Sequence, residues 1–269
     1  MKEPFIKADP SFFAINAWQT GHPRLVTGFT TRDGGVSKEP YDSLNFGLHT
    51  DDRPEDVIKN RELLAGLLHV PLEQWVLAEQ VHSNRVAVVT EADSGKGTRD
   101  YHTSLTGMDG LITNRKNILL AAFFADCVPL FFFDPETELI GIAHAGWKGT
   151  VQNIAGEMIG KLAGLGARKE NIMAAIGPSI SGGCYEVDDS VISQIDIRHR
   201  TAAKEKENGR YLLDLRRLNA ELLKEHGLAE AHISITQRCT LTDEAHFYSY
   251  RRDQGRTGRM LGFIGWQPE

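Results

Sequence analysis

Several stretches of the chain are continuously apolar, and they predict strands buried on both faces. The three longest cover residues 118–124, 128–133 and 139–145, and a turn at Asp134-Pro135-Glu136-Thr137 separates the last two. Runs without polar alternation are typical of central strands that are covered on both sides. Shorter runs at residues 25–31, 75–81, 85–90, 171–176, 232–237 and 260–264 predict further strands.

A different periodicity predicts three helices between these strands. Residues 54–68 carry a proline in the first turn and an apolar stripe at Val57, Leu64, Leu67 and Leu68. Residues 151–162 follow the i, i+3, i+4, i+7 spacing after Thr150, which we predict as the N-cap. A third helix over residues 215–223 is closed by Gly227.

The order of these elements predicts a mixed α/β (α+β) fold without regular βαβ alternation. We expect a single layered domain over residues 1–269, with a mixed central sheet flanked by helices. Residues 197–210 are charged and poor in large apolar side chains, so we predict a surface loop there.

Composition limits the class of protein. Of 269 residues, 41% are hydrophobic and 25% are charged, which is typical of a globular protein with a sizeable core. The formal charge of −6 argues against a nucleic-acid partner. The longest apolar run has eight residues, whereas a membrane-spanning helix needs about 20. The N-terminus lacks the apolar core of a signal peptide, so we expect a cytoplasmic protein without a membrane partner, as a monomer or small homo-oligomer.

Polar residues interrupt the buried strands at a few points, and these are the candidate chemistry. Asp126 and Cys127 stand between two core strands, His144 closes the third, and His82 follows an earlier run. Two histidines and one cysteine suit a tetrahedral zinc ion with one open position. The spacing matches no compact metal motif, so on spacing alone a buried thiol beside two core histidines is the favoured alternative. A cysteine nucleophile with His144 as its base is another.

Other polar positions are candidates for binding phosphate or substrate. Lys148 lies in HAGWKGT, which runs from a strand end into a helix N-terminus, a geometry suited to anions. Asn45, Arg61 and Gln80 are further candidates, although a solvated helix arginine is the ordinary explanation for Arg61. Asp109 is either a turn residue or a carboxylate that supports a ligand. Residues 250–253 form either a surface ion-pair cluster or an anion site.

Taken together, these motifs resemble one known family. TTRDGGVS, YDSLNFGLHT, QVHS, GMDGLIT, ADCVPL, HAGWKGT, IGPSISGGCYEV and FYSYRRD occur in the order of the YfiH/YlmD-type laccase-domain family, also called polyphenol oxidase-like. The resemblance implies one zinc ion held by His82, Cys127 and His144. It also implies phosphorolysis of adenosine, inosine, guanosine and S-methyl-5′-thioadenosine, with deamination of adenosine. Relatives often carry another cysteine where this chain has SGG before Cys184.

The laccase label implies copper, and the chain does not favour that chemistry. Multicopper oxidation needs four copper ions held by many histidines, often as H-x-H, and the ten histidines here include no such pair. Our hypothesis is that zinc activates water for attack at C6 of adenosine, with Asp126 or Asp109 as the proton donor. For phosphorolysis, Arg61, Lys148 and the helix start near Thr150 would hold phosphate. A metal-free hydrolase and a nucleoside-binding protein without activity are the alternatives.

Overall fold

The computed structural model describes residues 2–268, and its strands form two six-stranded mixed sheets and one small sheet. The first sheet has the order β1 (Ile6–Asp9), β2 (Phe12–Ala14), β3 (Leu25–Thr30), β15 (Met260–Trp266), β7 (Leu119–Phe124), β4 (Trp75–Leu77). The second has the order β14 (Ile233–Ile235), β10 (Met173–Ile176), β8 (Val128–Phe133), β9 (Ile140–Ala145), β6 (Gly110–Thr113), β5 (Val86–Val88). The small sheet has the order β11 (Glu186–Asp188), β13 (Arg210–Leu213), β12 (Ala203–Glu205).

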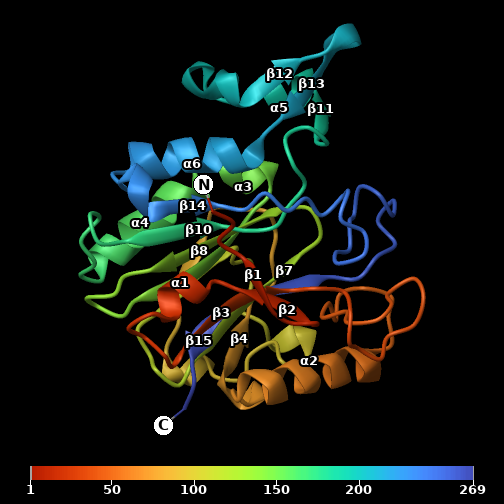
Figure 1. Cartoon of the computed structure of the whole chain (residues 1–269), viewed down its shortest axis with the longest axis vertical. Coiled ribbons are helices and arrows are strands. Elements are labelled where there is room, and N and C mark those ends of the chain that lie inside the picture. Colours follow the sequence, from red (N-terminus) through yellow and green to blue (C-terminus); the bar gives the residue numbers. More distant parts are fainter. Residues whose placement is uncertain (1, 269) are drawn as a thin grey trace.

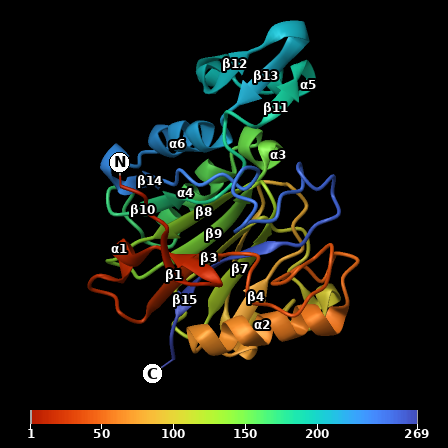
Figure 2. The ribbon, with the colours of Figure 1, turned by 45° about the vertical axis from the view of Figure 1, so that its right-hand side comes forward.

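Helices cover the outer faces of the two large sheets. The longest, α2 (Pro54–Leu68), packs on the first sheet, and α4 (Ile154–Gly164) and α6 (Leu215–Glu225) pack on the second (Figure 1). Shorter helices are α1 (Asn16–Gln19), α3 (Trp147–Val151) and α5 (Asp189–Ile192). The small sheet projects beyond α6, at the end of the molecule opposite α2 (Figure 2).

Three buried clusters hold these layers together. One lies between α2 and the first sheet, one between the second sheet and the pair α4 and α6, and one between the two sheets. The middle cluster is rich in aromatic side chains, including Phe29, Phe124, Phe131 and Phe133. Burial of each such ring stabilises the fold by roughly 1.5–3 kcal/mol. The predicted mixed α/β class is confirmed, but the strands form two stacked mixed sheets where one central sheet was expected.

Most predicted elements are confirmed, with two corrections. Helix α2 has the predicted bounds, with Pro54 in its first turn. Thr150 is not the cap of the next long helix, because α4 begins after Asn153, whose side chain accepts a hydrogen bond from the Gly156 amide at 3.1 Å. The predicted loop at residues 197–210 contains β12, which pairs with β13 in spite of its exposed, polar residues.

Two connections carry the chain from the first sheet to the second. One joins β4 to β5, and the other joins β7 to β8 through residues 125–127. His82 lies in the first connection and Cys127 in the second, while His144 is near the end of β9. The strand order therefore places these three residues at one edge of the sheet stack. Among the described residues, no helix combines the length and hydropathy that a bilayer crossing requires.

Candidate metal centre and substrate cavity

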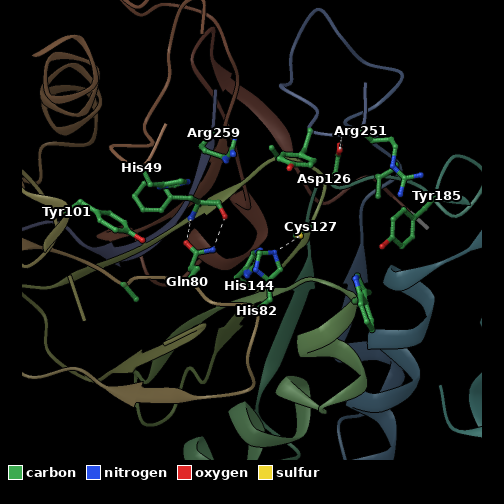
Figure 3. Close-up of a pocket in the computed structure, with 16 residues that line it drawn as sticks. His49, Gln80, His82, Tyr101, Asp126, Cys127, His144, Tyr185, Arg251 and Arg259 are labelled. Atoms are coloured by element: carbon green, nitrogen blue, oxygen red, sulfur yellow. Dashed lines mark hydrogen bonds between the residues drawn. The ribbon is translucent and has the colours of Figure 1, made fainter. Parts of the chain in front are cut away.

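His82, Cys127 and His144 converge at this edge of the sheets (Figure 3). One ligand atom from each lies within 4.8 Å of the others. The Cys127 Sγ is 3.9 Å from the His82 Nε2, and the two imidazole rings are 4.7 Å apart at an angle of 79°. In a tetrahedral zinc site with bonds of about 2.0–2.3 Å, ligand atoms are separated by about 3.3–3.8 Å. The cluster therefore has the donor types and nearly the spacing that one zinc ion requires.

The backbone at this cluster is unusual. His82 has φ of +60° and Asp126, beside Cys127, has φ of +87°. Side chains other than glycine seldom occupy this left-handed region, and each such residue costs of order 1–3 kcal/mol. Gly146 fits closely against the cluster, because a Cβ there would lie 2.9 Å from His82 and 3.0 Å from Cys127. The fold thus maintains a strained, tightly packed arrangement around these side chains.

A buried carboxylate, Asp109, orients both histidines. Its Oδ1 lies 2.9 Å from the His144 Nδ1 and accepts a hydrogen bond from the His82 amide at 3.0 Å. Its Oδ2 accepts hydrogen bonds from the amides of Val81 and Ser83 and from the Ser83 hydroxyl. Occupation of Nδ1 leaves the His144 Nε2 free, as is usual for histidines that bind metals. Of the two roles considered for Asp109, this geometry matches the supporting carboxylate.

The thiol and imidazole in the cluster alter each other's protonation. Burial acts to raise the pKa of Cys127, but His144 and His82 outweigh it and lower the pKa to about 6. Burial acts to lower the pKa of His144, but Cys127 and Asp109 outweigh it and raise the pKa to about 9. A thiolate is the form that binds metal, so the thiol is prepared for such binding near neutral pH.

Asp126, which the sequence suggested as a proton donor, is occupied by structural contacts. Its carboxylate accepts hydrogen bonds from the Thr240 hydroxyl at 2.6 Å, the Ser249 hydroxyl at 2.9 Å and the Arg251 amide at 2.7 Å. The residue reaches the cavity wall, but these bonds tie residues 125–127 to the C-terminal loops. This geometry supports a role as an anchor.

The cluster of His82, Cys127 and His144 lies in the wall of a cavity of about 490 Å³. An adjoining lobe of about 260 Å³ shares His82, Cys127 and Trp147 with it and adds Lys148 and Leu215. The main cavity is partly aromatic, and its wall includes Phe123, Tyr101, Tyr185 and Tyr250. Its volume is typical of a site for a small organic ligand.

Two predicted ligand-binding residues, Asn45 and Arg61, do not line either lobe. Both side chains are fully buried. The Arg61 guanidinium donates hydrogen bonds to the carbonyl groups of Phe46, Gly97 and Thr98 at 2.6–3.1 Å. This placement corrects both interpretations of Arg61, because the residue is neither a solvated helix arginine nor a phosphate contact in the cavity. Asn45 is similarly engaged, with its amide group bonded to Thr50, Asp52, Gly47 and Arg259.

We expect Arg61→Met to destabilise the fold. The substitution leaves three buried carbonyl groups without a donor, and each unsatisfied group costs about 1–3 kcal/mol, so the free energy of unfolding should fall by about 3 kcal/mol or more. Urea denaturation measures this change. Arg53→Met, at a side chain that is 72% exposed just before α2, is the control and should change stability by less than about 0.5 kcal/mol. Unchanged stability of Arg61→Met together with weaker phosphate binding would restore the original prediction.

Gln80 and Lys148 reach the two lobes in different ways. Gln80 lines the main cavity, but its amide group is paired with the main chain of Phe123, accepting from N–H at 2.7 Å and donating to the carbonyl oxygen at 2.9 Å. Lys148 is exposed and lines only the adjoining lobe, where its Nζ lies 5.7 Å from the centre of the Trp147 ring. Gln80 therefore holds Phe123 in place, and Lys148 faces the adjoining lobe without a hydrogen-bond partner among the described residues.

His49 and Arg259 line the cavity but escaped prediction as ligands. Arg251 was left open within the 250–253 cluster, whose neighbour Arg252 is paired with Asp253. Within residues 2–268, neither Arg251 nor Arg259 forms an ion pair with a carboxylate. Burial lowers the pKa of Arg259, whose Nη1 donates to the carbonyl groups of Thr257 and Gly258. A half-buried guanidinium without an acidic partner in a cavity is typical of an anion site.

Residues 26–267 match the sequence model of a family described as multi-copper polyphenol oxidoreductase laccase. The chain belongs to this family. One relative, purine nucleoside phosphorylase YlmD of Bacillus subtilis, is 49% identical over 97% of both chains. Purine nucleoside phosphorylase YlmD of Geobacillus stearothermophilus is 45% identical over 91% of both chains.

Solved structures also resemble this chain along its whole length. The structure of the hypothetical protein YfiH of Bacillus licheniformis has a TM-score of 0.95 at 41% identity and covers 98% of this chain and 100% of that one. The structure of YlmD from Geobacillus stearothermophilus has the same TM-score and identity, with 99% and 100% coverage. The resemblance to the YfiH/YlmD-type family is therefore confirmed.

Proposed function

We propose that this protein is a zinc-dependent purine nucleoside phosphorylase. It would convert adenosine, inosine, guanosine or S-methyl-5′-thioadenosine and inorganic phosphate into the free base and the ribose 1-phosphate. The names of the YlmD relatives support this reaction. The observation that carries the proposal is a His-Cys-His cluster in the wall of a cavity that also presents two arginines, neither of which forms an ion pair with a carboxylate among the described residues.

The cluster fits one zinc ion better than a set of copper ions. It supplies two imidazole nitrogens and a thiol whose pKa is lowered to about 6 by His144 and His82 in spite of burial. A multicopper centre needs far more ligands than these three side chains provide. A bound zinc ion would supply a Lewis acid at the cavity wall. Metal analysis of protein purified without added metal tests this choice, with copper as the contrary result.

The protein's own groups would hold the substrates in the remaining space. The cavity is large enough for a nucleoside together with phosphate, since pockets for such ligands range over about 300–1,000 Å³. Arg259 and Arg251 would attract phosphate, because neither is neutralised by a carboxylate among the described residues. The aromatic walls would exclude water and pack against the base and sugar.

Adenosine deamination is proposed as a second activity of the same cavity. It would use the same nucleoside site with water in place of phosphate. Its test is ammonia release from adenosine in buffer free of phosphate. If ammonia is not released while phosphorolysis proceeds, the deaminase activity is excluded and the phosphorylase proposal stands.

One geometric feature favours a metal-free hydrolase as the rival function. Cys127, His144 and Asp109 are arranged as nucleophile, base and orienting carboxylate. This rival predicts activity that chelators do not reduce and a covalent adduct on Cys127. The zinc proposal predicts loss of activity with chelation and recovery with added zinc.

Arg259→Gln should weaken phosphate binding. We expect the KM for phosphate to rise by about 10- to 150-fold, because one charged hydrogen bond to the phosphate contributes about 1.5–3 kcal/mol. Initial rates of inosine phosphorolysis at varied phosphate concentration measure this change. Arg256→Gln is the control, since Arg256 is exposed and does not line either lobe. Equal effects of the two substitutions would contradict the assignment.

A further inference from the structure

His49 is a cavity residue whose imidazole has no hydrogen-bond partner within residues 2–268. It lines the main cavity together with His82 and His144. Those two histidines are committed to the cluster, whereas His49 takes part only in ring contacts. A polar ring in a cavity wall with both nitrogens free is available to a ligand.

The wall around His49 fixes the position of this ring. His49 packs on Phe123, with ring centres 5.2 Å apart, and on Tyr101, with centres 5.7 Å apart. Phe123 is itself held by the amide group of Gln80 and by the Arg61 guanidinium, which lies 5.3 Å from its ring centre. The residues that the sequence marked as ligands therefore stiffen the surface on which His49 rests. Figure 3 shows His49, Tyr101 and Gln80 on one side of the cluster and Tyr185 on the other.

The charges near His49 suit a group that becomes negative during a reaction. Desolvation and the positive charges of Arg259 and Arg61 lower the pKa of His49 to about 4. The ring is therefore neutral near pH 7, with one N–H donor and one acceptor nitrogen. The guanidinium groups, which add to the effect of burial on His49, also create a positive potential in this part of the cavity.

We propose that His49 is a catalytic residue that donates its N–H to N7 of the departing purine, an inference that rests on the proposed function. In phosphorolysis, a phosphate oxygen forms a bond to C1′ while the bond from C1′ to N9 breaks. The electron pair of the broken bond passes to the purine ring, where N7 shares the negative charge. The proton of hydrogenphosphate ends on the purine, so the products are the neutral base and ribose 1-phosphate.

A donor placed where charge develops stabilises the transition state more than the ground state. The fixed ring of His49 is such a donor, because it needs no reorganisation during the reaction. The aromatic wall of Phe123 and Tyr101 would pack against the purine, which places the leaving group in the part of the cavity that Arg259 lines. Asp126 is the one carboxylate among the described residues that line the main cavity, and its oxygens are already engaged by Thr240, Ser249 and Arg251.

The test compares guanosine with 7-methylguanosine. A methyl group on N7 gives the base a positive charge, so this base leaves without a donor. His49→Phe keeps the ring packing and removes the N–H. We expect His49→Phe to lower kcat/KM for guanosine by about 10- to 100-fold and for 7-methylguanosine by less than about threefold. His49→Gln, which restores an N–H donor, should recover part of the guanosine activity.

Two outcomes separate this proposal from the proposed function. If the unmodified protein does not phosphorolyse guanosine, the phosphorylase function fails. If it does, and His49→Phe lowers both activities equally, then His49 has only a packing role and the catalytic proposal is wrong. If Tyr101→Phe loses guanosine activity but keeps 7-methylguanosine activity, and His49→Phe does not show this pattern, the donor is the tyrosine and the proposal is wrong.

Product binding gives a second measurement that needs no turnover of the methylated substrate. Inhibition constants of hypoxanthine and 7-deazahypoxanthine are compared in both proteins. The unmodified protein should bind hypoxanthine about tenfold more tightly than the analogue that lacks N7, and His49→Phe should bind the two equally. If both proteins prefer hypoxanthine to 7-deazahypoxanthine by the same factor, the proposed contact between His49 and N7 is wrong.

Discussion

Cys127→Ser should lose both the metal and the activity. We expect metal-free protein after purification and a fall in kcat/KM for inosine of about 10²–10³-fold, since a catalytic metal contributes several kcal/mol to the transition state. A hydroxyl has a much higher pKa than a thiol, and this thiol has its pKa lowered to about 6 by two imidazoles that outweigh burial. Metal analysis and phosphate-dependent turnover are measured on the same sample.

Cys184→Ser is the matched control for this substitution. Cys184 is a free, half-buried cysteine on the loop before β11, and it is not part of the ligand cluster. Cys184→Ser should keep full metal content and near-normal activity. Full activity of Cys127→Ser without metal would refute the metal centre. Unmodified protein that is active without metal, together with inactive Cys127→Ser, would favour the rival in which the thiol is the nucleophile.

The position of the ligand cluster was predictable because polar residues at the ends of buried strands stand out from their surroundings. His82, Cys127 and His144 each follow or close an apolar run. Their convergence requires that β4 and β7 be neighbours in one sheet, and that the chain then cross to the sheet that contains β9. Pairing partners so distant in sequence leave no local signal, so periodicity alone could not separate a metal site from a buried thiol. The resemblance to a known family was what favoured the metal site.

The arrangement of strands in two sheets was less visible for a related reason. Strands that are apolar on both faces suit one central sheet covered by helices, and they suit two stacked sheets equally well. In β7 and β8 all six residues are buried, because each strand has the other sheet on one side and helices on the other. The sequence shows that both faces are covered but does not show what covers them.

Sequence alone did not identify which polar and charged residues line the cavity. Arg61 and Asn45 looked like ligands, but they are buried supports for loops. Arg259 and His49 lie in polar loop segments that gave no periodic signal, yet both face the cavity. Whether an arginine meets a carbonyl group, a carboxylate or open space depends on distant segments. Arg61 meets carbonyl groups from two loops separated by about 50 residues.

Asp109→Asn should weaken metal binding by about 100-fold without removing a ligand. Supporting groups of this kind typically contribute 10- to 100-fold to metal affinity, and Asp109 contacts both histidines. Its two oxygens have five hydrogen-bond partners: the backbone amides of residues 81–83, the Ser83 hydroxyl and the His144 Nδ1. An asparagine offers one acceptor oxygen and an NH₂ group, so either orientation brings a donor against backbone N–H groups. The turn at His82 and the tautomer of His144 then lose their common support.

Asp134→Asn provides the control for Asp109→Asn, because it makes the same chemical change at another buried carboxylate. Asp134 is 1% exposed and accepts hydrogen bonds from Glu136 and Thr137 in the turn between β8 and β9, where it contacts none of the three candidate ligands. Both substitutions should lower the free energy of unfolding by about 1–3 kcal/mol, as urea denaturation reports. Only Asp109→Asn should shift the metal dissociation constant in a chelator competition. If the two variants bind metal equally well, Asp109 supports the fold alone, and the affinity of the cluster depends on its three ligands without this carboxylate.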